Sequence, residues 1–293
     1  MYDVIVIGAG PTGSTAANIC AKSGLSTLIL EEHSSIGFPV QCAGLLSNSA
    51  FEECNVSNSS IINRVTGAKI IGSDDNHVLD FNAPEPKAVV VNRNQLDYEM
   101  ATHAIESGAN ISLKTVVTSI SPDKNKIYTV GVNGKQEYTY KTLIAADGPR
   151  SVTAHVLGLG NSKYVYSGIQ AEIPWNGNPN QVEIYPNASS DFFAWVIPIS
   201  SNRARVGLCG MKNVLENFNR FIKRFSSPSR INEIVGTLPI GIRPKTYAPR
   251  CLIVGDAAGF LKPISGGGIY TGVRSAKHAA TVAIMANTSD DYS

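Results

Sequence analysis

The first 31 residues limit the fold more than any other part of the chain. Tyr2 to Ile7 is an apolar run rich in Val and Ile, typical of a buried parallel strand. It is followed by Gly8-Ala9-Gly10-Pro11-Thr12-Gly13 and then by Ser14 to Ser23, with Ala and Ile at helical spacing. A second apolar run, Leu25 to Leu30, ends at Glu31. The order strand, G-x-G-x-x-G, helix, strand and acid predicts the βαβ unit of a Rossmann-like α/β domain.

The glycine loop suits the diphosphate of a dinucleotide. Gly8 permits the tight turn, Gly10 lets the backbone approach a pyrophosphate, and Gly13 lets helix and strand pack closely. The N-terminus of the following helix presents free N–H groups and a positive dipole to the phosphates. Glu31 is placed to accept hydrogen bonds from both ribose hydroxyls. The candidate contacts are Gly8, Gly10, Thr12, Gly13 and Glu31. This fingerprint alone does not distinguish NAD from FAD.

Composition and charge exclude several other classes. The net charge is +2, and no run of Lys and Arg has the density of a nucleic-acid-binding stripe. No apolar stretch approaches the length of a membrane span, and the N-terminus lacks a signal segment, so we expect a cytoplasmic protein. The five cysteines are odd in number and form no CxxC pair, which argues against a disulfide framework and against a metal site.

Three later segments repeat the pattern of a strand that ends in a polar or glycine-rich turn. Ala88 to Asn92 is a short strand followed by Arg93 and a helix, and Leu143 to Ala146 ends in Asp147-Gly148. Cys251 to Val254 ends in Gly255-Asp256, and Gly266 to Ile269 leads into a final helix. Ile111 to Ile120 is expected to form one further strand.

This order of motifs resembles, over nearly the whole chain, the FAD-dependent group that includes aromatic hydroxylases and geranylgeranyl reductases. The resemblance implies FAD, with its ADP half on the first fingerprint and Asp256 at a ribityl hydroxyl or the inner pyrophosphate. It implies that Arg93 reaches the cofactor and that the backbone of Val117 pairs with adenine. The backbone N–H groups of Gly267, Gly268 and Ile269 would then lie near the flavin N1–C2=O edge, where they stabilise the reduced flavin.

Two stretches are similar to the geranylgeranyl reductase branch of that group. One is IGFPVQCAGLL, which contains Cys42, and the other is Phe193-Ala194-Trp195-Val196-Ile197-Pro198, followed by Gly207-Leu208-Cys209-Gly210. Phe193 and Trp195 alternate along one strand and therefore share a face. By the resemblance this face lines a slot for a polyisoprenoid chain, while the residues alone fit an ordinary aromatic core face equally well.

Cys42 has no single role that its sequence context requires. It lacks partners for a metal site, and no His or other base lies near it in sequence to activate it as a nucleophile. A disulfide with Cys20 or Cys54 has no support in a cytosolic setting. The small neighbours Ala43 and Gly44 favour close approach to a flat ring, and the resemblance puts the segment beside the flavin. We therefore expect Cys42, Ala43 and Gly44 to contact FAD, and we hypothesise that Cys42 helps to deliver a proton to the substrate.

The implied activity is reduction of carbon–carbon double bonds in geranylgeranyl chains, either on an archaeal-type glycerolipid or on a diphosphate. The electron donor is open between NAD(P)H and a ferredoxin-like protein, and the lipid implies peripheral contact with a membrane surface. Two alternatives remain. One is an FAD-dependent aromatic monooxygenase, and the other is a shortened flavin-binding paralogue without prenyl reductase activity.

The expected architecture is a discontinuous FAD-binding domain and an antiparallel sheet that caps it. The FAD-binding domain takes residues 1–70, 88–158 and 237–293, and the substrate sheet takes 71–87 and 159–236. The resemblance also implies a further C-terminal segment that helps to enclose the lipid, whereas this chain ends soon after its last expected helix.

Overall fold

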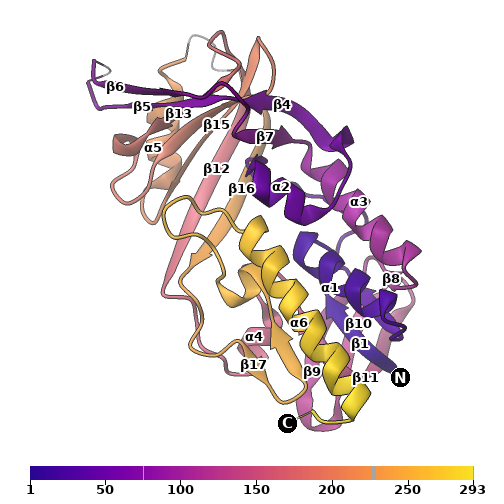
Figure 1. The fold of residues 1–293 in the computed structure, drawn as a ribbon. Coiled ribbons are helices and arrows are strands. Elements are labelled where there is room, and N and C mark those ends of the chain that lie inside the picture. The colour runs from indigo at the N-terminus through magenta and orange to yellow at the C-terminus, as the bar shows by residue number, and fades with distance from the viewer. Residues whose placement is uncertain (75, 226–228, 293) are drawn as a thin grey trace.

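The computed structural model describes residues 1–74, 76–225 and 229–292, so small parts of the expected segments 71–87, 159–236 and 237–293 lie outside it. Figure 1 shows two layered parts, a lower one that holds both termini and an upper one built around a second sheet. The lower sheet has the order β17-β18-β11-β1-β2-β8. Its strands are β17 (Tyr247–Ala248), β18 (Cys251–Ile253), β11 (Gly134–Ala145), β1 (Tyr2–Ile7), β2 (Thr27–Leu30) and β8 (Asn110–Ser112).

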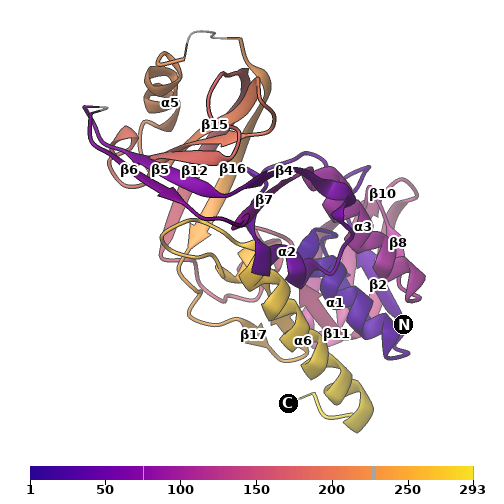
Figure 2. The same ribbon diagram turned by 45° about the horizontal axis from the view of Figure 1, so that its top comes forward.

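The centre of the lower sheet is parallel and buried on both faces. β1 pairs in parallel with β2 and β11, and β18 extends β11 in parallel, whereas the edge strand β17 is antiparallel. Val4 and Val6 of β1 face α1 (Pro11–Lys22) and α6 (Ile269–Ser289), which lie side by side in Figures 1 and 2. Ile5 and Ile7 point to the opposite face, where they pack with Ile120 and Ile127. This double burial explains why β1 is an uninterrupted apolar run.

The segment expected as one strand, Ile111 to Ile120, forms two. β8 pairs with β2, whereas β9 (Val116–Ser121) pairs with β10 (Lys126–Gly131), which in turn pairs with the first half of β11. The break follows from contacts with a segment distant in sequence: the N–H groups of Lys114 and Thr115 donate to the carbonyl oxygens of His33 and Glu31, at 2.9 and 2.8 Å. These bonds bend the chain around the end of β2.

The upper sheet has seven strands in the order β16-β12-β15-β14-β13-β5-β6, antiparallel except for the β13–β5 pair. They are β16 (Ile231–Ile240), β12 (Tyr164–Pro174), β15 (Arg203–Gly210), β14 (Ala194–Pro198), β13 (Gln181–Tyr185), β5 (Gly67–Ile71) and β6 (Val78–Asn82). One face is covered by α5 (Val214–Ile222) through Phe218, Phe221 and Ile222 (Figure 2). The other face is turned toward the lower part of the molecule.

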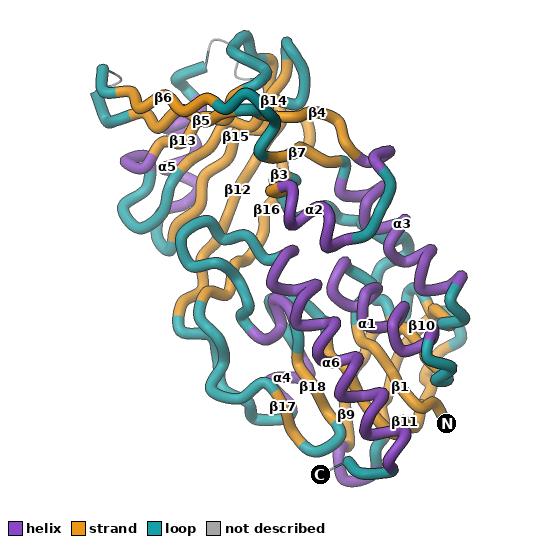
Figure 3. The backbone as a smooth tube through the Cα atoms, in the orientation of Figure 1, coloured by secondary structure: helices purple, strands orange, loops and turns teal. Residues whose placement is uncertain are grey.

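A small three-stranded sheet joins the two parts. β7 (Ala88–Val91) lies between β3 (Leu45–Ser47) and β4 (Ile61–Val65), next to α2 (Asn48–Cys54) and α3 (Arg93–Glu106). Long loops, shown in teal in Figure 3, link α4 (Val152–Val156) to β12 and β16 to β17, and a further loop links the end of β18 to α6. The structure therefore confirms the predicted fold class, a Rossmann-like parallel sheet with an antiparallel cap, while the exact domain boundaries stay a prediction. None of the helices in the described part of the chain has both the length and the apolar character needed to cross a bilayer.

Candidate cofactor and substrate site

The glycine loop between β1 and α1 is tightly packed on one side and open on the other. A Cβ atom at Gly13 would lie 1.9 Å from the carbonyl oxygen of Gly8, so only glycine fits there. At Gly10, by contrast, no described atom lies within 4 Å of the position that a Cβ would take. Gly10 is the N-cap of α1 and offers no side-chain cap, which leaves first-turn N–H groups free for a ligand. The loop thus has both the space and the donors for a pyrophosphate.

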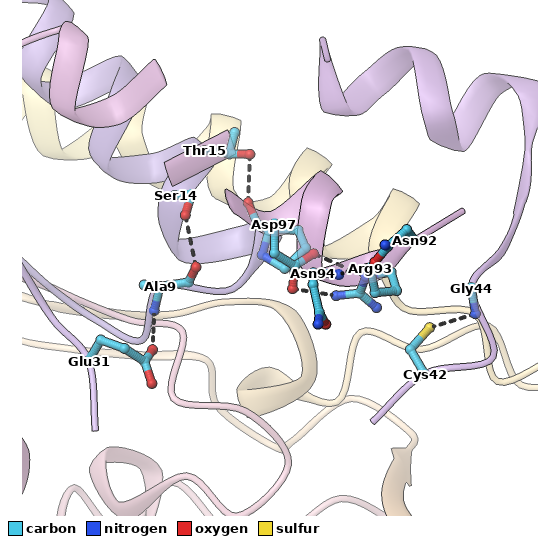
Figure 4. Close-up of polar contacts among 11 residues, drawn as sticks. Ala9, Ser14, Thr15, Glu31, Cys42, Gly44, Asn92, Arg93, Asn94 and Asp97 are labelled. Carbon is cyan, nitrogen blue, oxygen red and sulfur yellow. Dashed lines mark hydrogen bonds and ion pairs between the residues drawn. The ribbon is translucent and has the colours of Figure 1, made fainter. Parts of the chain in front are cut away.

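Glu31 lies beside this loop at the end of β2. Its carboxylate is buried, and Oε2 accepts the N–H of Ala9 at 2.8 Å while Oε1 accepts the N–H of His33 at 2.9 Å (Figure 4). Val117 follows the bend at Thr115, which is bonded to the Glu31 carbonyl, and its side chain is half-buried. Val117 is therefore at the same end of the site as Glu31, where the sequence predicted adenosine.

Thr12 and Asp256 link the start of the chain to its last segments. The Thr12 hydroxyl packs against Gly255 and Gly272, where a Cβ atom would approach it to 2.8 and 2.5 Å. Thr12 therefore packs α1 against η4 (Gly255–Ala258) and α6. Asp256 is half-buried, and its carboxylate makes no hydrogen bond with any described residue. Burial raises the pKa of Asp256 to about 6, although Arg93 opposes the shift.

The glycines before α6 leave room for the Asp256 carboxylate. A Cβ atom at Gly268 would lie 2.6 Å from its Oδ1, so the carboxylate and this turn are in close contact. Gly267 is exposed, its N–H donates to Ser265 Oγ at 3.4 Å, and Ile269 begins α6. A partly buried carboxylate without a hydrogen-bond donor, next to backbone amides, fits the hydroxyls of a polyol chain such as ribityl.

Arg93 lies at the centre of the site, between the Ala9–Glu31 pair and Cys42 (Figure 4). It forms a bidentate ion pair with Asp97, with Nε to Oδ1 at 3.0 Å and Nη2 to Oδ2 at 2.9 Å. Both side chains are nearly buried. Burial lowers the pKa of Arg93, but the nearby Asp97 and Cys42 outweigh this effect and raise the pKa of the guanidinium.

Cys42 is held by its own segment as well as by Arg93. The N–H of Gly44 donates to Cys42 Sγ at 3.3 Å. Cys42 is half-buried, whereas the other four cysteines are buried.

The two predicted substrate-lining residues lie on the inner face of the upper sheet. The Phe193 and Trp195 rings meet edge to face at 6.1 Å, and Phe193 stacks on Phe192 at 4.6 Å. The indole N–H of Trp195 donates to Gln170 Oε1 at 2.9 Å. Trp195 also packs with Ala43 and Leu45, so the aromatic face and the Cys42 segment adjoin.

The structure thus brings the predicted residues into one continuous site. The glycine loop, Glu31 and Val117 form one end, Asp256 and the Gly267–Ile269 turn form the middle with Arg93, and the Cys42 segment and the aromatic face form the other end. These residues fit an elongated dinucleotide followed by an apolar ligand.

Two residues of the site were not predicted from the sequence. Asp97 is four residues after Arg93, a spacing typical of helical ion pairs, and this signal was available. Arg205 of β15 reaches the carbonyl oxygens of Ala43 and Val91, and nothing near it in sequence indicates these partners.

Comparison with known proteins agrees with this geometry. Residues 1–240 match the family model of the FAD binding domain. The chain is 32% identical over 311 residues to digeranylgeranylglycerophospholipid reductase 2 of Methanothermobacter thermautotrophicus, covering 97% of this chain and 78% of that protein. It is also 32% identical to the digeranylgeranylglycerophospholipid reductase of Picrophilus torridus, covering 100% of this chain and 80% of the relative.

Solved structures with a similar fold were also found. A geranylgeranyl bacteriochlorophyll reductase-like protein from Thermoplasma acidophilum superimposes with a TM-score of 0.90 at 28% identity, covering 100% of this chain and 80% of that one. A p-nitrophenol 4-monooxygenase from Pseudomonas putida superimposes with a TM-score of 0.79 at 18% identity, which shows a shared fold alone. The cofactor is therefore FAD, which confirms the prediction from the sequence.

Proposed function

This chain belongs to the geranylgeranyl reductase family of FAD-binding oxidoreductases, and we propose that it saturates the carbon–carbon double bonds of geranylgeranyl chains carried by a glycerophospholipid. The observation that supports this proposal best is an apolar track that leads away from the Cys42 segment along the inner face of the upper sheet. The names of the curated relatives supply the class of lipid.

The track follows directly from strand register. Trp195 of β14 pairs with Ile184 of β13, Ile184 pairs with Ile70 of β5, and Ile70 pairs with Leu79 of the edge strand β6. Paired residues share a face, so these four apolar side chains form a row from Trp195 to the edge of the sheet. Leu79 at the end of the row is 60% exposed.

The length of the row suits a polyisoprenoid chain. Three steps between neighbouring strands at roughly 4.8 Å each give a track of about 14 Å. A long polyisoprenoid chain can lie along this track while one of its double bonds remains near Trp195 and Cys42. A single aromatic ring, the substrate of the monooxygenase alternative, would leave most of the track uncovered.

An isolated double bond has no carbonyl group to accept charge, so a proton must reach one carbon as hydride reaches the other. FAD, once reduced and bound, is the source of the hydride. The inner face of the upper sheet orients the chain and excludes water. Cys42 is the proposed proton donor, because its segment adjoins the aromatic face and because the Gly44 N–H holds its Sγ in place.

The electron donor, NAD(P)H or a ferredoxin-like protein, and peripheral contact with a membrane surface are further parts of the proposal. The family supports these two kinds of electron donor, and the lipid substrate supports the membrane contact. The lipid has to leave a bilayer to reach the track, so the exposed end of the row at Leu79 is its proposed entrance.

An anaerobic single-turnover experiment tests the proposal. The FAD-loaded protein is reduced with dithionite, mixed with geranylgeranylated glycerophospholipid and followed by the flavin spectrum and by lipid mass spectrometry. We expect flavin reoxidation together with the gain of one H₂ per saturated bond. A protein that binds FAD yet returns the lipid unchanged would be the flavin-binding paralogue, and rapid O₂ uptake with an aromatic compound and NAD(P)H would point to the monooxygenase.

The role of Cys42 is tested in the same assay. Cys42→Ser and Cys42→Ala should retain FAD, because most of the expected cofactor contacts lie in the glycine loop and around Asp256. Both should slow lipid reduction by at least about tenfold, as for loss of a general acid. Cys251→Ala is a suitable control, since this buried cysteine lies on β18 of the lower sheet, away from the Cys42 segment and the aromatic face. Equal rates in Cys42→Ala and the unchanged protein would remove the thiol from the mechanism.

A further inference from the structure

The peptide bond between Ala43 and Gly44 is held from the upper sheet by one side chain. Arg205 Nη1 donates to the carbonyl oxygen of Ala43 at 2.8 Å and to that of Val91 at 3.1 Å. Its Nε lies 3.4 Å from Glu172 Oε1, and the Arg205 and Glu172 side chains are only 12% and 15% exposed. One guanidinium therefore ties the segment that carries Cys42 to the strand that leads into Arg93.

The same peptide bond carries the N–H that reaches the thiol. The Ala43 carbonyl and the Gly44 N–H belong to one planar unit, and in a trans peptide they point in opposite directions. When Arg205 fixes the carbonyl on one side, the N–H is fixed toward Cys42 Sγ on the other, where it lies at 3.3 Å. The positive charge on the carbonyl also polarises the N–H and strengthens its bond to sulfur.

Gly44 makes this arrangement possible. Its φ of +74° lies in the left-handed region that favours glycine. A Cβ atom at Gly44 would lie 2.4 Å from Arg205 Nη1 and 2.7 Å from the Val91 carbonyl oxygen. The glycine that the sequence suggested for close approach to a flat ring is thus also the residue that admits Arg205.

We propose that Arg205 is a positioning residue that sets the acidity of the Cys42 thiol through the plane of the Ala43–Gly44 peptide. The use of that thiol in proton delivery rests on the proposed function, but its acidity does not. Two charged groups act on Cys42 directly or through the peptide, Arg93 from α3 and Arg205 from β15. Each arginine also faces carboxylates. Asp97 and Asp256 face Arg93, and Glu172 faces Arg205.

Alkylation of Cys42 measures this acidity without any lipid. Iodoacetamide reacts with the thiolate, and Cys42 is the half-buried cysteine while Cys20, Cys54, Cys209 and Cys251 are buried. The rate is followed by mass spectrometry from pH 5 to 10 on the FAD-loaded protein, with Cys42→Ala as the blank.

In Arg205→Met we expect the midpoint of the rate against pH to rise by about one unit, with a rate at neutral pH about tenfold lower, since one hydrogen bond to a charged group is weakened. The plateau at high pH should be unchanged. Arg205→Lys keeps a positive charge but loses the planar guanidinium that bonds two carbonyl oxygens. Its midpoint pH should lie between that of the unchanged protein and that of Arg205→Met.

Arg203→Met is the matched control. Arg203 is two residues before Arg205 on the same strand, lies 3.9 Å from Glu172, is about half exposed and does not reach the Cys42 segment. Its profile should match that of the unchanged protein. The proposal is overturned if Arg205→Met gives an unshifted midpoint, or if it lowers the rate equally at every pH, because that result reports access alone. Should Arg205→Met fail to fold, the midpoint in Arg205→Lys decides in the same way.

Discussion

The indole ring of Trp195 lies directly against Gly207 on the neighbouring strand. A Cβ atom at Gly207 would be 2.3 Å from the ring, and the indole N–H also donates to Gln170, which pairs with Gly207 in the sheet. Gly207 therefore leaves the space that the Trp195 ring, twelve residues earlier in the chain, occupies. Together they set the depth of the proposed track.

Gly207→Ala should displace the indole and weaken its bond to Gln170. We expect the free energy of unfolding to fall by about 1 to 3 kcal/mol, the usual effect of overpacking a buried site. Urea unfolding measures this change, and the KM for lipid should rise more than kcat falls because binding is what the ring serves. Gly168→Ala on β12 is the matched control, since its Cβ would lie 3.4 Å from Leu238, an ordinary contact.

Removing the ring tests whether the two residues act as a pair. In a Trp195→Ala background the Gly207→Ala change should cost much less than it does alone, because the clash is gone. Additive losses in the double variant would mean that Gly207 is required for a reason other than Trp195.

The two glycines of the N-terminal loop should separate folding from cofactor binding. Gly13→Ala brings a methyl group into collision with the Gly8 carbonyl, so the apoprotein itself should lose several kcal/mol of stability or fail to accumulate. Gly10→Ala meets open space, so the apoprotein should unfold at the usual temperature while FAD binds at least about tenfold more weakly. Thermal unfolding and FAD titration of both variants check this. Equal FAD affinity in Gly10→Ala would place the pyrophosphate elsewhere.

Much of the FAD end of the site was predictable because its signals are local. The N-terminal strand, turn and helix are each encoded within a few residues, and the structure has β1 at the predicted Tyr2–Ile7. Arg93 was found through the family resemblance, because it begins a helix just after the short apolar strand β7. For the glycine loop, the chain direction at the end of the parallel strand β1 already places the turn at the cofactor edge.

The contacts that organise the other end were not predictable in this way. Arg205 lies 162 residues after Ala43 and 114 after Val91, and it meets them only because the upper sheet folds back over the lower part. The break between β8 and β9 was missed for the same reason, since its cause is hydrogen bonding of Lys114 and Thr115 to the end of β2. A hydrophobic pattern shows which residues are buried but not which distant backbone groups they meet.

The buried pair of Arg93 and Asp97 should be far more important for stability than a similar pair at the surface. Asp97→Asn leaves the guanidinium buried without a counter-charge, so we expect a loss of about 3 kcal/mol or more in the free energy of unfolding. Glu216→Gln is the control, because Glu216 and Arg220 have the same i,i+4 spacing but are 69% and 72% exposed. Its effect should stay within about 0.5 kcal/mol.

Urea unfolding at neutral pH compares the two changes. Asp97→Asn should also lower FAD affinity, since Arg93 loses the partner that orients it between the cofactor site and Cys42. Similar small losses for both variants would mean that Arg93 is stabilised by groups other than Asp97.

Asp256 should make the stability of the apoprotein depend on pH. Burial raises its pKa from 3.8 to about 6 in the folded protein, so the folded state binds this proton more tightly than the unfolded chain does. The contribution of Asp256 to stability therefore declines as pH rises from about 4 to about 6, and it is constant above that range.

Asp256→Asn removes the loss of stability that comes from burying an ionised carboxylate. The FAD-free variant should be more stable than the unchanged protein at pH 7, by up to about 3 kcal/mol, and the difference should vanish below about pH 4. With FAD bound, the unchanged protein should be more stable than Asp256→Asn, because the amide is a weaker acceptor than the carboxylate for a ribityl hydroxyl. Urea unfolding at pH 4 and 7, with and without FAD, measures all four cases. A variant that is less stable at pH 7 without FAD would show that the carboxylate is stabilised by the protein itself and is not kept for the cofactor.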